Sequence, residues 1–240
     1  MRGPYLIAVC DILGFSELVE RHSLDSVVDD AVGWFRKALN HSLLGGTFAA
    51  SPPQTRELEN HPHVSVAWFS DTILLYTKHD TDVAVGELLQ AVGSLLFETI
   101  LGGVTKIRAG IAYGEAHMDP ANSIYVGLPI VEAYRLEKRQ QWAGAALAPS
   151  ACARLAACGP SGEIARWWVT SWDVPLEGGA STTTLAVNWN RCVHDPIWRL
   201  RWSESSEMPT DEASLSLKEK FMNTKRFHEA LCEDCNRREA

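Results

Sequence analysis

The chain has 240 residues, of which 46% are hydrophobic and 22% charged, enough for one sizeable core with a tail. Its net charge of −8 argues against a nucleic-acid-binding surface, because a phosphate backbone requires clustered Lys and Arg. No apolar run reaches the roughly 18–20 residues that span a bilayer, and six cysteines are too few for a disulfide scaffold. We therefore expect a cytoplasmic protein that neither inserts into membranes nor binds nucleic acid.

The first half of the chain predicts a strand, a long helix and a hairpin. Residues 5–11 form an apolar run of strand length, and residues 18–43 carry apolar side chains at helical spacing. Residues 45–63 contain two glycines and a pair of prolines, which predicts a long loop. Residues 64–69 and 72–77 predict two strands joined by a tight turn.

The second half predicts alternating helices and strands. Ala84, Leu88 and Val92 begin the apolar stripe of a helix that ends before Gly102 and Gly103. The remaining elements are expected in this order: strands over 106–115 and 123–126, helices over 129–141 and from 149, and a closing hairpin of strands over 167–172 and 182–189.

This order of elements is typical of an α/β fold, here an α+β sandwich with helices packed on one side of a mixed, mainly antiparallel sheet. After residue 196 the composition becomes polar and acidic, although residues 215–231 can form an amphipathic helix. We therefore divide the chain into a domain over residues 1–200 and a polar C-terminal tail over residues 201–240.

Two of the predicted strands end in an aspartate, Asp11 and Asp71. A carboxylate at the mouth of a strand is costly to desolvate unless it is hydrogen-bonded or meets a cation. If the two strands are neighbours, their carboxylates form the oxygen ligand set that magnesium and manganese prefer. Each residue also has an ordinary structural interpretation, since Asp11 can cap the turn at Gly14 and Asp71 can occupy a hairpin turn.

The stretch Asp11-Ile12-Leu13-Gly14-Phe15, together with Asp71 in its hairpin, resembles the class III nucleotidyl cyclases. Within that class the chain is most similar to the pyrimidine cyclases of the Pycsar antiphage systems. Most of the chain, from residue 5 to about residue 189, can be aligned with the pattern. The resemblance implies the fold of the cyclase homology domain.

The resemblance also implies a metal-dependent site at the end of the first strand. Two divalent ions, Mn²⁺ or Mg²⁺, would be held by Asp11, Asp71 and the backbone carbonyl of Ile12. Backbone N–H groups at the start of the following helix would then meet phosphate oxygens. These groups belong to Leu13, Gly14 and Phe15.

Gly127 begins a helical stretch that is similar to the arginine motif of the family, and Arg135 follows it by eight residues. The resemblance implies that Arg135 stabilises the charge that builds at the α-phosphoryl group. Val131 stands where the family has a ribose-binding asparagine, and Glu177 where it often has a phosphate-binding lysine; Arg108 is a candidate to bind the triphosphate instead. Other polar side chains could contact the ribose: Glu132, Gln140 or Gln141.

The residues at the base-reading positions of the family disfavour a purine. Ala67 and Ile124 occupy these positions, and neither can form the hydrogen bonds that identify a purine edge. The adjacent Trp68 and Tyr125 could fill the volume that a purine would need. A pyrimidine is therefore expected, with UTP preferred over CTP because uridylate cyclases are the more frequent in the family.

The resemblance thus implies conversion of UTP to cyclic UMP and pyrophosphate by a homodimer with composite active sites. The cyclic nucleotide would activate a partner effector in antiphage defence. Three alternatives stay open: a cytidylate cyclase, a degenerate cyclase that binds nucleotide without turnover, and a protein-interaction module with incidental aspartates.

A zinc site in the C-terminal region is a further, weaker alternative. Cys232 and Cys235 form one CxxC pair, and Cys192 and His194 could complete four ligands. A single CxxC in an acidic tail is a weak signal for zinc.

Overall fold

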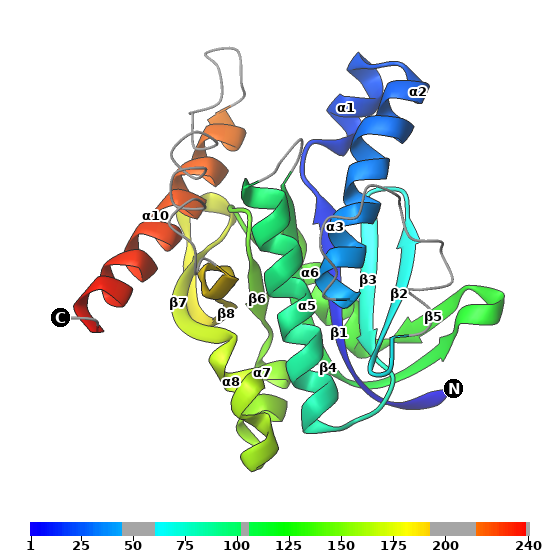
Figure 1. The fold of residues 1–240 in the computed structure, drawn as a ribbon, viewed down its shortest axis with the longest axis vertical. Coiled ribbons are helices and arrows are strands. Elements are labelled where there is room, and N and C mark those ends of the chain that lie inside the picture. Colours follow the sequence, from blue (N-terminus) through cyan, green and yellow to red (C-terminus); the bar gives the residue numbers. More distant parts are fainter. Residues whose placement is uncertain (45–60, 102–105, 193–214, 239–240) are drawn as a thin grey trace.

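The computed structural model describes residues 1–44, 61–101, 106–192 and 215–238, and Figure 1 shows its central sheet. The strands are β1 Arg2–Ile12, β2 Val64–Phe69, β3 Thr72–Thr77, β4 Ile107–Asp119, β5 Ile124–Gly127, β6 Ala145–Leu147, β7 Val169–Pro175 and β8 Ser181–Val187. They form an 8-stranded sheet in the order β2-β3-β1-β4-β6-β8-β7, with β5 paired to β4. The pair β4 and β6 is parallel and the other ladders are antiparallel, so the predicted fold class is confirmed.

The helices alternate with these strands along the chain. The α-helices are α1 Phe15–Arg21, α2 Leu24–Ser26, α3 Gly33–Leu44, α5 Asp82–Leu101, α6 Leu128–Arg139, α7 Pro149–Ala156, α8 Glu163–Trp167 and α10 Leu215–Arg238. Within the described residues, a π-helix spans Val27–Val32, and 3-10 turns lie at Pro120–Asn122, Pro160–Gly162, Glu177–Gly179 and Trp189–Cys192. The strand and the α-helix that the sequence did not predict, β6 and α8, are only 3 and 5 residues long.

The single helix predicted over residues 18–43 is wrong, because the chain turns after Arg21. Ser23 adopts an extended backbone conformation, and its side chain accepts a hydrogen bond from the Ser26 N–H at 3.3 Å. This serine cap begins a new helical turn, which continues through the π-helix at Val27–Val32 into α3. The apolar spacing of the segment persists across this break, which explains the prediction.

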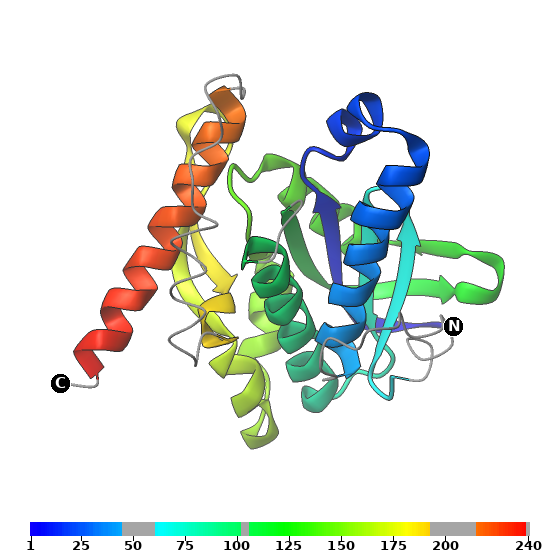
Figure 2. The ribbon, with the colours of Figure 1, turned by 45° about the horizontal axis from the view of Figure 1, so that its top comes forward.

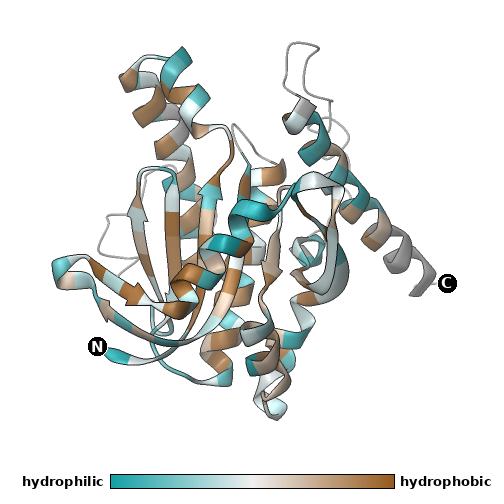
Figure 3. Ribbon diagram, turned by 180° about the vertical axis from the view of Figure 1, so that it is seen from behind, coloured by the Kyte–Doolittle hydropathy of each residue, from teal (hydrophilic) through white to brown (hydrophobic). Residues whose placement is uncertain are grey.

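Helices cover both faces of the sheet, and not one face as the element order suggested. On β1, every second side chain from Leu6 to Ile12 belongs to the core beneath α3 and α5, whereas Tyr5, Ile7 and Val9 belong to a second core cluster with Ala133 of α6. Figure 3, seen from behind, shows α6 lying across this second face, with its C-terminal half hydrophilic. Because β1 is apolar on both faces, it is buried on both.

The packing of α6 on the sheet depends on a glycine. A Cβ atom at Gly110 of β4 would collide with the carbonyl oxygen of Ala133 in α6. The helix can therefore approach the strand closely, and it brings Glu137 and the residues after it to the strand end at Asp11.

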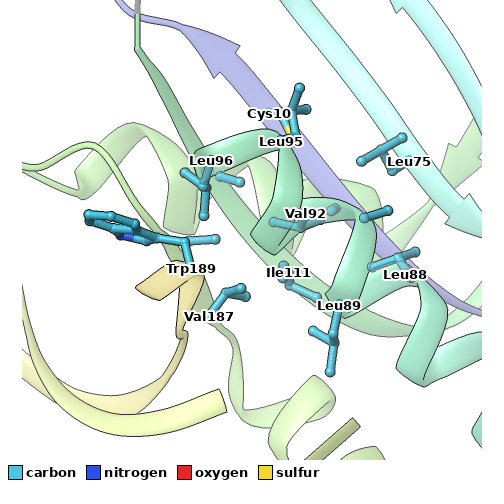
Figure 4. Close-up of a cluster of buried hydrophobic side chains, with 14 of the residues drawn as sticks. Cys10, Leu75, Leu88, Leu89, Val92, Leu95, Leu96, Ile111, Val187 and Trp189 are labelled. Carbon is cyan, nitrogen blue, oxygen red and sulfur yellow. The ribbon is translucent and has the colours of Figure 1, made fainter. Parts of the chain in front are cut away.

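The larger core lies between α5 and the sheet. One side of α5 meets the strands and the segment after β8, as Figure 4 shows. Its labelled side chains are Leu88, Leu89, Val92, Leu95 and Leu96 of α5 with Cys10, Leu75, Ile111, Val187 and Trp189. Among the described helices, α5 alone is long and apolar enough to cross a membrane, but 78% of its most apolar window is buried inside the fold, which is typical of a core helix.

The C-terminal helix α10 packs along the domain beside β7 and β8 (Figure 2). Phe227 is fully buried, and its ring lies 4.8 Å from Trp142, 5.1 Å from Trp172 and 6.4 Å from Trp189, centroid to centroid. The division at residue 200 falls in a part of the chain outside the described residues and stays a prediction. The helix in the predicted tail nevertheless shares a core with the domain.

Candidate functional site

The ends of β1 and of the β2–β3 hairpin bring the two predicted aspartates next to each other. Asp11 is paired with Thr72 in the antiparallel ladder between β1 and β3. The N–H of Ile12 donates to the carbonyl oxygen of Asp71 at 3.0 Å. Ser70, with φ of 55°, forms the sharp turn that places Asp71 there. Residues 60 positions apart in sequence therefore share one edge of the sheet, as predicted.

Asp11 is buried and lies against two cations. The Nζ of Lys138 donates to its Oδ1 at 2.9 Å, and Nη2 of Arg108 lies 3.5 Å from its Oδ2. Lys138 itself is partly exposed. The pKa of Lys138 is raised overall, because the hydrogen bond to Asp11 and the charge of Glu137 outweigh the opposing effect of burial. The Asp11 carboxylate thus meets positive charge from two different elements.

Arg108 is the centre of this network. Its Nε donates to Glu137 Oε1 at 2.7 Å, and its Nη1 donates to the carbonyl oxygen of Gln140 at 2.7 Å. Burial raises the pKa of the Glu137 carboxyl above its usual value, and the charge of Arg108 opposes this shift. Both side chains are almost fully buried. These contacts favour a structural role for Arg108, whose predicted contact with a triphosphate would require it to leave them.

Two aspartates at this edge provide the type of ligand that a hard divalent cation prefers. Asp11 and Asp71 offer carboxylate oxygens, and the ammonium group of Lys138 already occupies one oxygen of Asp11, so this position attracts positive charge. Within the described residues, no group of three or more His, Cys, Asp or Glu side chains is placed to hold a metal. Any ion here must therefore use the two aspartates with backbone oxygen, such as the carbonyl of Ile12, or water.

The turn after β1 is positioned by a backbone contact. The N–H of Leu13 donates to the carbonyl oxygen of Lys106 at 2.8 Å, so this donor is already used. Gly14 has φ of 78° and precedes α1, a left-handed conformation that suits glycine. Phe15 packs partly against the larger core. Contacts from the N–H groups of Gly14 and Phe15 to phosphate stay a prediction.

Arg135 is exposed on α6 and lines a groove of about 740 Å³ between that helix and β8. Val131, one turn earlier on the same face, is also exposed and lines the same groove. No ion pair among the described residues engages Arg135. The structure therefore leaves the guanidinium accessible and does not bring it into contact with Asp11 of its own chain.

The two aromatic residues expected to fill a base pocket lie against opposite faces of the sheet. Trp68 packs on the α3 face, with its ring 6.4 Å from Phe35, and its Nε1 donates to the carbonyl oxygen of Ser70. Tyr125 packs on the α6 face, with its ring 6.0 Å from Tyr76. The two rings therefore do not share one pocket within a chain, which corrects the expectation that both fill the volume of a purine.

Ala67 and Ile124, the residues at the base-reading positions, are both accessible. Ala67 is half-buried and contacts the same cluster as Tyr125, whereas Ile124 is exposed at the start of β5. The possible zinc ligands cannot be placed, because the side chains of Cys192, Cys232 and Cys235 and all of His194 lie outside the described residues.

Sequence reasoning named Arg108 but missed the other cations near the site, which are lysines. Lys138 follows Arg135 by three residues, so the two lie on neighbouring parts of the α6 surface. This spacing could have identified Lys138 as a candidate site residue. Lys106 precedes β4, and Lys220 comes from α10; both line a cavity beside Leu13. Nothing in the sequence pattern shows where α10 packs, so Lys220 carried no signal.

No protein-family model and no curated protein sequence matches the chain. Among solved structures, the chain is similar to the catalytic core of a rhodopsin-guanylyl cyclase with converted specificity in complex with ATPαS, with a TM-score of 0.51 and 14% identity over 78% of this chain and 97% of that one. The guanylyl cyclase Cya2 is similar with a TM-score of 0.42 and 17% identity, over 78% of this chain and 91% of that one. The adenylate/guanylate cyclase/hydrolase from Silicibacter pomeroyi has a TM-score of 0.43 and 16% identity, over 78% of this chain and 96% of that one. The first of these structures shows that the chain has the fold of a nucleotidyl cyclase catalytic core.

Proposed function

We propose that the protein is a nucleotidyl cyclase, and more narrowly a uridylate cyclase that converts UTP to 3′,5′-cyclic UMP and pyrophosphate. The observation that supports this most is the position of Asp11 at the end of β1, beside the turn that carries Asp71, in a fold of the cyclase class. Two carboxylates at one strand edge provide what phosphoryl transfer requires, which is a site for metal ions and charge neutralisation.

In this proposal the ribose 3′-hydroxyl attacks the α-phosphorus, the new O–P bond closes the ring, and the bond to the β-phosphate oxygen breaks. The hydroxyl proton passes to solvent, and pyrophosphate leaves. Two divalent ions, Mn²⁺ or Mg²⁺, would supply charge neutralisation while bound by Asp11, Asp71 and the carbonyl of Ile12. The N–H groups of Gly14 and Phe15 would orient phosphate oxygens.

Arg135 would stabilise charge at the α-phosphoryl group from a second copy of the chain. Its exposure, and the absence of an ion pair to it among the described residues, support a role in a homodimer with two composite sites. The base would be a pyrimidine because Ala67 and Ile124 cannot read a purine edge, with Tyr125 as a candidate to pack against it. We further propose a cytoplasmic protein whose cyclic nucleotide acts on an effector in antiphage defence.

The test is incubation of the purified protein with all four ribonucleoside triphosphates and Mn²⁺, with products identified by mass. We expect cyclic UMP and pyrophosphate. Cyclic CMP as the main product would support a cytidylate cyclase. Cyclic AMP or cyclic GMP with UTP unchanged would contradict the pyrimidine assignment.

A second candidate function is nucleotide binding without turnover. The ion pair between Lys138 and Asp11 favours it, because that ammonium group occupies a carboxylate that catalysis would need for metal. Val131 and Glu177, at positions where the resemblance implies asparagine and lysine, point the same way. Saturable UTP binding without any cyclic product, with Mn²⁺ present, would establish this second function over the first.

A further inference from the structure

A cavity of about 390 Å³ lies between the turn after β1 and the C-terminal helix. Leu13 and Gly14 line one side, Lys220 and Phe221 of α10 line the other, and Lys106 lies at the start of β4. The end of β1 and the beginning of α10 stand at the same end of the molecule (Figure 1). The cavity therefore borders the turn that follows Asp11.

The charged residues around this cavity are mostly basic. Arg21, Lys106 and Lys220 contribute three cations, and Glu17 contributes one carboxylate. The whole chain carries a net charge of −8, so the local balance is the reverse of the average. An anion is therefore favoured here over a cation.

Lys106 and Lys220 are half-buried, and no ion pair among the described residues engages either ammonium group. Lys138, by contrast, binds Asp11 at 2.9 Å. Burial lowers the pKa of Lys106, and burial followed by the charge of Arg108 lowers that of Lys220. Both groups have lost hydration, and no carboxylate of the described residues forms an ion pair with either, although the charges of Asp11, Glu137 and Glu177 act on Lys220 from farther away. An anion bound in the cavity would offset the lost hydration.

The docking of α10 fixes where Lys220 lies. One turn later, Thr224 accepts a hydrogen bond from the N–H of Ala143 at 2.8 Å, and Asn223 donates to the carbonyl of Gln141 at 2.7 Å. Residues four apart share a helix face, so Lys220 stands on the side of α10 that meets the domain. The lysine is thus presented to the cavity by a specific contact of the helix.

We propose that this cavity binds a chain of phosphoryl groups, with Lys106 and Lys220 as its cationic contacts. The inference rests on the proposed function, because it assigns the triphosphate tail of the substrate to this cavity. Glu177 begins the turn between β7 and β8, which carries no basic residue, so this turn supplies no positive charge. Helix α10 then supplies that charge and is part of the substrate site.

The experiment is calorimetric titration of the full-length protein with inorganic triphosphate in the absence of divalent metal. Lys220→Gln and Lys106→Gln should each weaken binding about tenfold or more, since each removes a charge-assisted hydrogen bond. Lys225→Gln is the matched control on the same helix, because Lys225 faces Glu229 at 3.8 Å and does not line the cavity. Lys220→Arg keeps the charge and should retain most of the affinity.

Circular dichroism establishes that each variant is folded. Affinities that are equal for the wild type and both glutamine variants would overturn the inference, as would a wild type that does not bind triphosphate. UTP should displace inorganic triphosphate, and failure to do so would show that the cavity is not the site of the nucleotide tail.

The turnover assay separates this inference from the proposed function. If cyclic nucleotide is made while Lys220→Gln binds triphosphate normally, only the assignment of the cavity is wrong. If the glutamine variants lose binding but the wild type makes no cyclic product, the cavity assignment stands and the cyclase proposal is wrong.

Discussion

The face of the sheet under α5 is packed mainly with aliphatic side chains, whereas the face under α6 holds a buried network of Asp11, Arg108 and Glu137. Both faces are formed by the same strands, since alternate residues of β1 point to each. Apolar burial stabilises a fold without any directional requirement. Buried charges cost free energy unless every partner is in place, so they contribute more to geometry than to stability. The comparison indicates that the α5 face supports the fold and the α6 face positions the strand ends for chemistry.

The largest effect that would test this comparison is loss of the two aspartates. Asp71→Ala and Asp11→Ala should each lower product formation about a thousandfold or more, because metal binding supplies several kcal/mol of transition-state stabilisation. The fold should survive. For Asp71, which is half-buried in a turn, the melting temperature should shift by no more than about 2 °C.

Turnover by mass-resolved product analysis, with thermal unfolding beside it, measures this prediction. Asp25→Ala, at an exposed position in the first turn of α2, is the control and should leave turnover unchanged. Near-normal turnover in either aspartate variant would show that the edge of the α6 face is not a two-metal site.

The next largest effect concerns stability. Arg108→Met should cost about 3–5 kcal/mol of unfolding free energy, because it removes the nearest cation of the buried Glu137 carboxylate and leaves only the partly exposed Lys138 at 3.7 Å. The double variant Arg108→Met with Glu137→Leu should recover most of that loss. On the other face, Leu95→Ala should cost about 2–5 kcal/mol with no such rescue. Urea denaturation gives these values, and a double variant as unstable as the single one would contradict the distinction between the faces.

The third prediction uses the exposed side of α6. Asp71→Ala and Arg135→Ala should each be inactive alone, but a mixed dimer would place both changes in one site and leave the other site complete. Random exchange makes about half the dimers mixed, each with one working site of two, so the mixture should recover roughly a quarter of wild-type activity. If subunits demonstrably exchange and activity stays absent, Arg135 does not act across a dimer.

The smallest effect concerns the ion pair between Lys138 and Asp11. Lys138 is partly exposed, so removing its charge should change the affinity of the Asp11 carboxylate for a metal ion by a modest amount. Lys138→Gln should lower the Mn²⁺ concentration needed for half-maximal activity about two- to fivefold, because the metal no longer competes with the ammonium group. Lys138→Arg should retain the wild-type requirement. An unchanged requirement in Lys138→Gln would show that this contact does not compete with metal.

Local patterns were sufficient to predict most of the sheet and the edge that carries Asp11 and Asp71. Apolar runs and a two-residue turn are local features, so β1 and the β2–β3 hairpin follow directly from the sequence. The break after Arg21 did not follow, because the apolar spacing continues across it and only the cap at Ser23 marks the change. The face of the sheet on which Trp68 lies was predictable in principle. Neighbouring residues of a strand point to opposite faces, so Trp68 and Ala67 had to lie on opposite faces.

The partners of Asp11 could not be predicted from any local pattern. Lys138 is 127 residues away in sequence and Arg108 is 97 residues away. Their approach to Asp11 depends on how closely α6 packs on β4. Gly110 makes this close packing possible, but a glycine in the sequence does not by itself predict it. The contribution of α10 was hidden for the same reason, since an amphipathic pattern shows that a helix packs but not where.

The contact between Phe227 and the surrounding indole rings gives the protein an optical reporter of its own. Trp142 and Trp189 are fully buried, and indole emission moves to longer wavelength when water reaches the ring. Detachment of α10 from a sheet that stays folded would therefore shift the emission to the red. Whether the helix that carries Lys220 is seated can thus be followed in solution, in real time, without attaching a label.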